Sequence, residues 1–382
     1  MKALVLEDVA RFEVRETASP AVGARDVLIR IGAVGICGTD LHIFNGYANY
    51  HRDQNGYQVP LTQAPQILGH EFCGVVEAVG KDVKKFKPGD RVIADQVLNC
   101  YSQARRPLCE YCETGDSHQC AHLVELGITG PPGAFADLIS VPEPNVLLLP
   151  PEVPVTKAAI IEPLACVLHA SDRMERSRNR YDFDGRYRIR NILITGAGPS
   201  GLLFIQYLRH VKKFDGPIFV SDMRSSRLAL AEKLGASPVD VRATDLAAEI
   251  RKRTKGELIH YWIDASGAGP IFDLPPLVLR HQATFLYYGS GHSGRDVGCM
   301  VPFQFMESNV VTSCGASGGF EADGTPVVYR RSMEYLHEGL IDADPLLTHL
   351  YAELSELQKA FQVDSLSDDY VKGAWVRNPA LW

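Results

Sequence analysis

The sequence predicts an α/β protein of two domains, an irregular β-barrel followed by a doubly wound parallel sheet. A chain of 382 residues is too long for one ordinary core. About the first 150 residues consist of short apolar runs interrupted by Pro and Gly, whereas helix-like and strand-like segments alternate from about residue 156. A glycine-rich turn directly follows a strand-like run that ends at Thr195.

The first domain is predicted from short strands with long loops between them. A Lys-Pro-Gly-Asp turn at residues 87–90 feeds one of these strands, because Pro sets one turn angle and Gly permits the next. The apolar runs are 3–6, 27–31, 74–79, 91–94 and 135–141, and residues 146–151 close the region. We expect this domain to span residues 1–157.

The second domain is predicted from strands that alternate with helices, which is typical of a parallel sheet covered on both faces. We expect it to span residues 158–299. Its predicted strands are 190–195, 218–221, 258–264 and 283–288, and its predicted helices are 199–211 and 225–234. Beyond residue 300 we expect a strand at 310–313 and helices at 327–339 and 355–361, but periodicity alone does not assign this tail to either domain.

Composition excludes several classes of protein. Hydrophobic residues make up 46% of the chain and charged residues 22%, and no run of about 18 apolar residues is long enough to span a bilayer. The net charge of −7 gives no general attraction to nucleic acid or to anionic lipid. Met1 and Lys2 lead directly into a strand-like run without a secretory signal, so we expect a cytoplasmic protein.

An arginine-rich segment lies at residues 173–190. Acidic residues are interleaved with its seven arginines, which favours a solvated connector or a subunit contact over a nucleic-acid patch. The arginines are Arg173, Arg176, Arg178, Arg180, Arg186, Arg188 and Arg190.

The glycine-rich turn indicates a dinucleotide site. Its G-x-G-x-x-G pattern opens a predicted helix, whose N-terminus offers free N–H groups to a pyrophosphate. Asp222 ends the next strand, where a carboxylate accepts hydrogen bonds from ribose hydroxyls and repels a 2′-phosphate, so NAD is favoured over NADP. Arg224 and Arg227 are the residues that could instead serve a 2′-phosphate. The turn comprises Gly196, Ala197, Gly198, Pro199, Ser200 and Gly201.

Four cysteines in a polar loop predict a structural zinc site. A closed set of four thiolates can surround Zn²⁺ tetrahedrally and leaves no open position. His118 and His122 lie in the same loop and are not needed as ligands. The four cysteines are Cys100, Cys109, Cys112 and Cys120.

A second set of donors is spread along the chain. Cys37, Thr39 and His42 share one short stretch, and His70 and Glu71 are adjacent in sequence. Together with a later acid, Glu162, they form a Cys/His/Glu set suited to a catalytic zinc with an open position.

In these motifs the sequence resembles the medium-chain zinc-dependent alcohol and polyol dehydrogenases over essentially its whole length. The matching stretches are residues 35–42, 69–71 with Gly74 and Gly80, 100–120, 162–164, 196–201 with Asp222, and 347–349. The resemblance implies a GroES-like catalytic domain built from residues 1–157 and 300–382, with a Rossmann domain inserted between them. It also implies a homodimer or homotetramer, whose contact we expect at the exposed sheet edge after about Val297.

The resemblance further implies a role for each site residue. Cys37 and His70 would bind the catalytic zinc, with Glu71 or Glu162 completing the protein ligands. Thr39 would take the substrate proton and pass it, through the cofactor ribose, toward His42 and solvent. The expected reaction transfers hydride from a secondary alcohol of a polyol, sugar or sugar derivative to NAD; aldoses and amino-acid alcohols of the threonine type are alternatives.

Two departures from the family pattern and two alternative functions remain at this point. Eight residues separate Cys100 from Cys109, where the family usually has two, and the arginine-rich connector is longer than usual. A zinc-free NADPH-dependent enone or quinone reductase would need neither metal set, and a zinc-stabilised sensor would bind nucleotide without turnover. Cys73, Cys166, Cys299 and Cys314 have no predicted role, and residues 47–57 with His51 are either a substrate entrance or an exposed loop.

Overall fold

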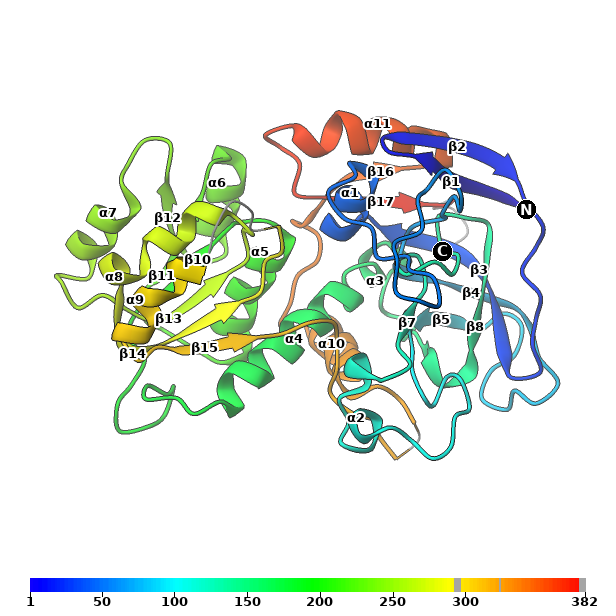
Figure 1. The fold of residues 1–382 in the computed structure, drawn as a ribbon, viewed down its shortest axis with the longest axis horizontal. Coiled ribbons are helices and arrows are strands. Elements are labelled where there is room, and N and C mark those ends of the chain that lie inside the picture. Colours follow the sequence, from blue (N-terminus) through cyan, green and yellow to red (C-terminus); the bar gives the residue numbers. More distant parts are fainter. Residues whose placement is uncertain (292–296, 323, 378–382) are drawn as a thin grey trace. The chain divides into compact units, whose positions relative to one another are not determined.

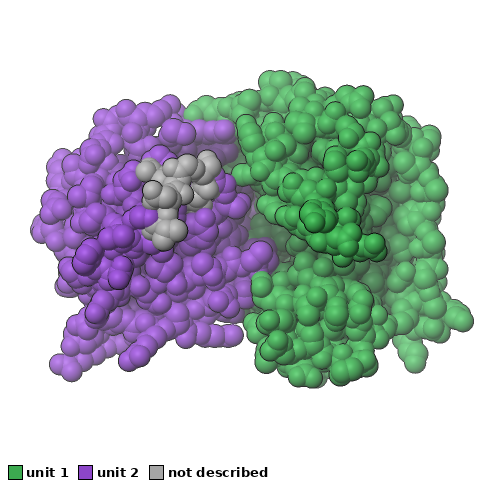
Figure 2. Space-filling model, viewed as in Figure 1, with its two compact units in different colours: residues 1–165, 316–338, 347–382 green, residues 166–315, 339–346 purple. Residues whose placement is uncertain are grey.

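The computed structural model describes residues 1–291, 297–322 and 324–377. The chain divides into two compact units, coloured separately in Figure 2. Unit 1 comprises residues 1–165, 316–338 and 347–382, of which 378–382 lie outside the described residues, and unit 2 comprises 166–315 and 339–346. The tail that periodicity left unassigned is therefore divided, with most of it in unit 1.

Unit 1 is built on a sheet of seven strands in the order β16-β17-β3-β4-β5-β9, with β8 paired to β3. The long strand β3 is its centre, because β4, β8 and β17 all pair with it in antiparallel register. The strands of unit 1 are β1 (Lys2–Asp8), β2 (Arg11–Glu16), β3 (Asp26–Gly35), β4 (Glu71–Val79), β5 (Arg91–Ala94), β6 (Val97–Leu98), β7 (Val124–Glu125), β8 (Leu138–Pro142), β9 (Val146–Leu148), β16 (Leu347–Tyr351) and β17 (Lys372–Val376).

The helices of unit 1 are mostly short and stand at the ends of strands. The longest, α4, carries the chain from unit 1 into unit 2. They are α1 (Gly38–Phe44), α2 (Glu110–Glu113), α3 (Val155–Ala158), α4 (Ile161–Arg176), α10 (Val327–His337) and α11 (Leu357–Gln362).

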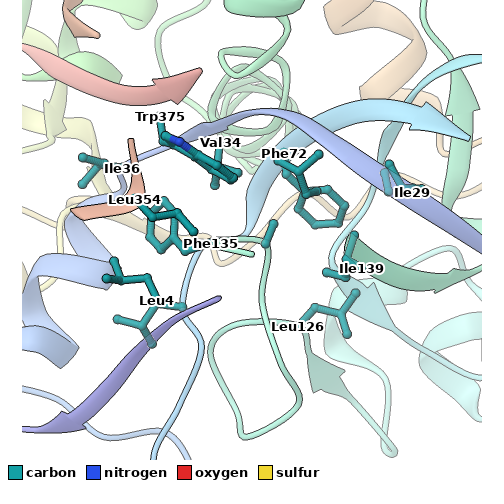
Figure 3. Close-up of a cluster of buried hydrophobic side chains, with 14 of the residues drawn as sticks. Leu4, Ile29, Val34, Ile36, Phe72, Leu126, Phe135, Ile139, Leu354 and Trp375 are labelled. Carbon is teal, nitrogen blue, oxygen red and sulfur yellow. The ribbon is translucent and has the colours of Figure 1, made fainter. Parts of the chain in front are cut away.

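The core of unit 1 joins its N-terminal strands to the C-terminal tail. Figure 3 shows Phe135, Phe72 and Val34 directed into one cluster with Leu354 and Trp375, residues that are all buried. Burial of each large side chain contributes about 2–3 kcal/mol. Apolar contacts between distant parts of the chain therefore hold the frame on which the site is built.

Unit 2 is a six-stranded sheet, and all of its strand pairs are parallel (Figure 1). The strand order is β12-β11-β10-β13-β14-β15. The chain adds β11 and β12 on one side of β10 and then β13, β14 and β15 on the other, which is the doubly wound arrangement that the sequence predicts. The strands are β10 (Ile192–Thr195), β11 (Ile218–Asp222), β12 (Ser237–Asp240), β13 (Ile259–Asp264), β14 (Leu279–Tyr287) and β15 (Asn309–Thr312).

Helices of unit 2 pack against this sheet through apolar side chains. Ile250, Val278 and Phe303, from three different helices, join one cluster with Trp262 and Phe285 of the strands. The helices are α5 (Pro199–Gln206), which continues as a π-helical turn (Tyr207–Val211), α6 (Ser225–Lys233), α7 (Leu246–Arg253), α8 (Pro275–Val278) and α9 (Val301–Phe305). Among the described residues, none of the helices is both long and apolar enough to cross a membrane.

The arginine-rich connector packs on unit 2 through its apolar residues. The rings of Tyr181 and His260 lie 4.7 Å apart at their centroids, and Phe183 contacts both Phe214 and Tyr261. All seven arginines of the segment are exposed. Its aromatic residues therefore anchor the segment, while its arginines face outward.

Candidate functional site

The stretch around Cys37 is a strand-to-helix turn. Strand β3 ends at Gly35, and Cys37 is the N-cap of α1. Asp40 is fully buried, and its Oδ2 accepts a hydrogen bond from the Cys37 backbone N–H at 2.9 Å. This interaction fixes the turn and presents the Cys37 thiol at the first turn of the helix.

His70 immediately precedes β4 and is oriented by the same aspartate. Its Nδ1 lies 3.3 Å from Asp40 Oδ1, which leaves Nε2 as the nitrogen available to a ligand. Burial lowers the pKa of His70, but Asp40 and Cys37 outweigh burial and raise the pKa well above its ordinary value. A histidine held by a carboxylate in this way is typical of metal ligands.

Glu71 forms a buried ion pair. Lys372 Nζ lies 2.5 Å from Glu71 Oε2, and both side chains are at most 2% exposed. A Cβ at Gly35 would stand 2.1 Å from that same oxygen, so only glycine leaves room for the carboxylate. Burial lowers the pKa of Lys372, but Glu71 and Cys37 raise it above the ordinary value, which keeps the lysine charged.

Cys37, His70 and Glu71 come together, with their ligand atoms all within 4.8 Å of one another. Sulfur, imidazole nitrogen and carboxylate oxygen are the donors that zinc prefers, so the set fits a zinc ion. Glu162 lies outside this group. It is the second residue of α4, it is buried, and its Oε1 accepts a hydrogen bond from Gln96 Nε2 at 3.2 Å.

Thr39 and His42 lie three residues apart on α1, so their side chains share one face of the helix. Both are half-buried. The imidazole of His42 packs edge-on against Tyr47, whose ring is 80% exposed. The pair therefore extends from the Cys37 turn toward solvent.

The four predicted cysteines meet in one lobe, and Cys100 belongs to it despite the longer spacing. All four Sγ atoms lie within 4.8 Å of one another, with Cys120 Sγ 3.7 Å from Cys100 Sγ and 3.8 Å from Cys109 Sγ. Zn–S bonds of about 2.3 Å in a tetrahedron separate sulfurs by about 3.8 Å, so the cluster fits zinc. Tyr101 holds the extra loop in place by packing its ring 4.6 Å from that of Phe320.

Electrostatics within the lobe favour at least one thiolate. Cys109 is the N-cap of α2, and backbone N–H groups at Ala121 and Cys112 lower its pKa to about 6. His122 contributes its backbone N–H to Cys120 Sγ at 3.3 Å. The ring of His118 contacts residues other than the four cysteines. Its Nε2 lies 3.2 Å from Asp95 Oδ2, and its Nδ1 accepts a hydrogen bond from the Ala316 N–H.

The glycine-rich turn joins β10 to α5 as predicted. Gly196 has φ +94°, and a Cβ there would meet the Ala265 backbone at 2.9 Å. A Cβ on Gly201 would stand 2.0 Å from Gly196 O, so only glycine at this position permits the close approach of the helix to the turn. Gly198 is the N-cap of α5 and Pro199 and Ser200 open the helix, so this cradle fits a pyrophosphate.

Asp222 ends β11 beside this turn. Its Oδ2 accepts the Ala197 N–H at 2.7 Å, and its Oδ1 accepts the N–H groups of Met223 and Arg224. A carboxylate has about four acceptor positions, so it retains capacity for a ribose hydroxyl. Arg227 faces the turn, with Nη1 3.7 Å from where a Gly198 Cβ would stand.

Three residues that support the site carry weak signals or none in the sequence. Asp40 is marked only by its place three residues after Cys37, and Lys372 by being a charge inside an otherwise apolar strand. Gln96 has no sequence signal. These residues act through contacts with segments far along the chain, which local patterns do not reveal.

The remaining candidates lie apart from the described metal clusters. Cys73 is buried, its Sγ lies 3.3 Å from Val155 O, and burial raises its pKa to about 12. Cys166 and Cys299 are half-buried and Cys314 is exposed. In the 47–57 loop Tyr47 and Tyr57 are mostly exposed, whereas His51 is half-buried; residues 49–59 are hydrogen-bonded mainly among themselves.

The structure combines a four-thiol lobe, a Cys/His/Glu cluster and a dinucleotide-type turn. This combination is typical of a zinc- and nucleotide-dependent oxidoreductase. Comparison with known families agrees. Residues 23–151 match the alcohol dehydrogenase GroES-like domain, and residues 199–332 match the zinc-binding dehydrogenase domain.

Two individual relatives define the family more closely. The chain is 31% identical to an L-threonine 3-dehydrogenase of Anaeromyxobacter sp. (strain Fw109-5), over 95% of this chain and 96% of that protein. It is 29% identical to a sorbitol dehydrogenase of Bacillus subtilis (strain 168), over 95% and 93% of the two chains. The chain therefore belongs to the medium-chain zinc-dependent alcohol and polyol dehydrogenases, which are oxidoreductases of alcohols.

Solved structures show the same fold. A putative zinc-binding dehydrogenase of Sinorhizobium meliloti 1021 bound to NADP superposes with a TM-score of 0.77 at 26% identity, over 98% of both chains. An alcohol dehydrogenase of E. coli CFT073 complexed with NADH gives a TM-score of 0.79 at 24% identity, over 98% of this chain and 99% of that one. The predicted combination of a GroES-like barrel with a Rossmann domain is confirmed.

Proposed function

We propose that the protein oxidises a secondary alcohol of a polyol, sugar or sugar derivative and transfers the hydride to NAD. The supporting observation is the Cys37/His70 pair with two buried acids, Glu71 and Glu162, in a chain that also has a dinucleotide turn. A threonine-type amino-acid alcohol is the second candidate, because the relative at 31% identity is an L-threonine 3-dehydrogenase.

In this proposal Cys37 and His70 hold the catalytic zinc, which when bound supplies the Lewis acidity that makes an alcohol proton easier to remove. Glu162 is the acid that we propose as the third protein ligand, with Glu71 as the alternative. Glu71 is already paired with Lys372, and drawing it away would leave a buried lysine without its carboxylate. Breaking a buried ion pair costs about 3–5 kcal/mol.

The protein's own groups would carry the proton. Thr39 would accept it from the substrate hydroxyl while releasing its own hydroxyl proton toward His42, which lies on the same face of α1 and would deliver a proton to solvent. An ordinary imidazole titrates near neutral pH and so can both accept and release a proton there.

The second zinc is proposed for the lobe of Cys100, Cys109, Cys112 and Cys120, where it would stabilise the fold. None of the nine cysteines, all within the described residues, forms a disulfide, and two thiolate sites require a reducing compartment, so we propose a cytoplasmic location. A homodimer or homotetramer is proposed as the working form.

Two observations weigh against the alternative functions. Both the lobe and the Cys37 cluster retain complete sets of donors, which a zinc-free reductase would not need. Thr39 and His42 stand on one face beside the Cys37 cluster, and a sensor without turnover would not need them.

NAD is proposed as the cofactor on the position of Asp222 at the end of β11. The test follows NADH or NADPH absorbance with polyols, aldoses, sugar acids and amino-acid alcohols. Turnover of a polyol or sugar with NAD supports the proposal. Turnover of threonine alone would support the second candidate, and reduction of enones with NADPH without zinc would contradict both.

A further inference from the structure

Two buried hydrogen bonds at neighbouring residues, Asp95 with His118 and Gln96 with Glu162, connect the four-thiol lobe to Glu162. We propose that Gln96 is a positioning residue that orients the Glu162 carboxylate at the catalytic metal site, and that the lobe fixes Gln96 through His118. The inference rests on the proposed function, because it takes Glu162 as a ligand of the catalytic zinc. Gln96 and His118 are not themselves proposed as zinc ligands.

The first step is the contact between Gln96 and Glu162. Gln96 is 2% exposed, its Nε2 donates to Glu162 Oε1 at 3.2 Å, and its Oε1 accepts from Tyr329 Oη at 3.0 Å. A carboxylate can only accept, so the amide must direct its NH₂ toward Glu162 and its oxygen toward the tyrosine. The hydroxyl of Tyr329 must then donate, and the orientation of the amide is fixed at both ends.

Hydrogen bonds hold the backbone on both sides of Gln96. Asn145 brackets it: its Nδ2 donates to Asp95 O at 2.9 Å and to Val97 O at 2.7 Å, and its own carbonyl accepts the Asp95 N–H. The carbonyl of Gln96 accepts the Leu126 N–H at 3.0 Å. With the main chain held on both sides, the side chain of Gln96 has little freedom to follow a displaced carboxylate.

His118 joins this segment to the lobe. His118 lies two residues before Cys120, and it is 4% exposed. Because its Nδ1 accepts the Ala316 N–H at 2.7 Å, its Nε2 carries the proton and donates to Asp95 Oδ2 at 3.2 Å. The His118 backbone N–H also donates to Ser317 Oγ at 2.8 Å. The lobe is thus attached to the residue next to Gln96.

The pattern differs from simple core packing. Gln96, Asp95 and His118 are all nearly inaccessible. His118 is hydrogen-bonded to Asp95, and Gln96, the next residue in the chain, is hydrogen-bonded to Glu162, an acid of the proposed metal site. A buried polar network is costly unless each member is satisfied. Partners of metal ligands typically change metal affinity by about 10–100-fold when they are removed.

The test compares Gln96→Leu and Tyr329→Phe with wild type. Each full-length protein is titrated with a chelator to measure the dissociation constant of the catalytic zinc, and Co²⁺ is substituted there to record its visible spectrum. We expect Gln96→Leu to raise the dissociation constant by about 10–100-fold and to shift the cobalt bands. Tyr329→Phe, which removes only the hydroxyl, should produce a smaller change in the same direction.

Gln66→Leu is the matched control. Gln66 is also buried in unit 1, at 3% exposure, and its amide has no hydrogen-bond partner among the described residues. Its replacement should leave both zinc affinity and the cobalt spectrum unchanged. His118→Gln should weaken catalytic zinc binding while four thiols remain in the lobe.

The outcomes separate this inference from the proposed function. If wild type binds two zinc ions and Gln96→Leu binds the catalytic one with unchanged affinity and spectrum, the positioning role is overturned and the proposed function stands. If Glu162→Gln also leaves that affinity unchanged, Glu162 is not a ligand. If wild type binds no zinc at the Cys37 site, the proposed function itself fails.

Discussion

The two cysteine-containing clusters of unit 1 hold their donor atoms in different ways. In the lobe, four thiols from residues 100–120 lie together, and backbone N–H groups at Ala121 and Cys112 favour the thiolate of Cys109. The Cys37 cluster instead combines three types of donor, and two of them have their own buried partner: Asp40 for His70 and Lys372 for Glu71. Glu162, outside the cluster, accepts a hydrogen bond from Gln96. In the function that we propose, the first arrangement would close a coordination shell, and the second would hold side chains around a shell that stays open.

Loss of a ligand should therefore have different consequences in the two clusters. A closed shell needs only four ligands brought together, so its failure should appear as lost stability. An open shell needs ligands whose orientation is enforced from outside, so its failure should appear as lost activity or altered metal affinity.

The largest effect should come from Cys37→Ser. Loss of a metal ligand removes a Lewis acid that is worth several kcal/mol, so turnover should fall by about 10³-fold or more. The affinity for NADH, measured by fluorescence titration, should stay within about twofold because the glycine turn belongs to the other unit. Activity close to that of wild type would contradict the catalytic assignment of the cluster.

Cys112→Ser should act mainly on stability. Losing the lobe metal should lower the free energy of unfolding by about 4 kcal/mol or more and the melting temperature by roughly 10 °C. Calorimetry with and without added zinc measures the change, and wild-type protein with zinc removed from both sites is the reference. An unchanged melting temperature together with lost turnover would reverse the roles that we give to the two sites.

One buried histidine, His260, belongs to neither cysteine-containing cluster. His260 is fully buried beside Tyr181, and burial together with Arg280 and Arg190 lowers its pKa to about 4. Its folded pKa lies below the unfolded value of about 6.5, so its neutral form favours folding at neutral pH. That stability should be lost as the pH falls from about 6.5 to 4, by about 3 kcal/mol at most.

The check is the melting temperature as a function of pH for wild type and His260→Leu. The variant lacks the titrating group, so its curve should fall less steeply between pH 6.5 and 4. Parallel curves for the two proteins would show that His260 does not titrate differently on unfolding.

The smallest effect should be that of Asp222→Ser on cofactor choice. Removing the carboxylate at the end of β11 removes its repulsion of a 2′-phosphate, so the preference for NAD over NADP should fall by about tenfold. The ratio of kcat/KM for the two cofactors measures it. Asp240→Ser, at the end of the neighbouring strand β12, is the control; an unchanged preference in Asp222→Ser would count against the ribose role.

Local patterns in the sequence predict those parts of the molecule that depend on neighbours along the chain. The four thiols, the glycine turn and the strand that ends at Asp222 could all be found, because spacing alone specifies them. Gln96 and Tyr329 could not, since they are 233 residues apart and meet only after folding. The place of Lys372 beside Glu71 likewise depends on β17 pairing with β3.

Elemental analysis of the purified protein is the most direct test of whether one chain holds two zinc ions with separate roles. We expect two zinc ions per chain in wild type. We expect one in Cys37→Ser, with the folded state retained and turnover lost, and one in Cys112→Ser, with stability reduced. Two zinc ions in Cys37→Ser, or none in an active wild-type enzyme, would contradict these separate roles.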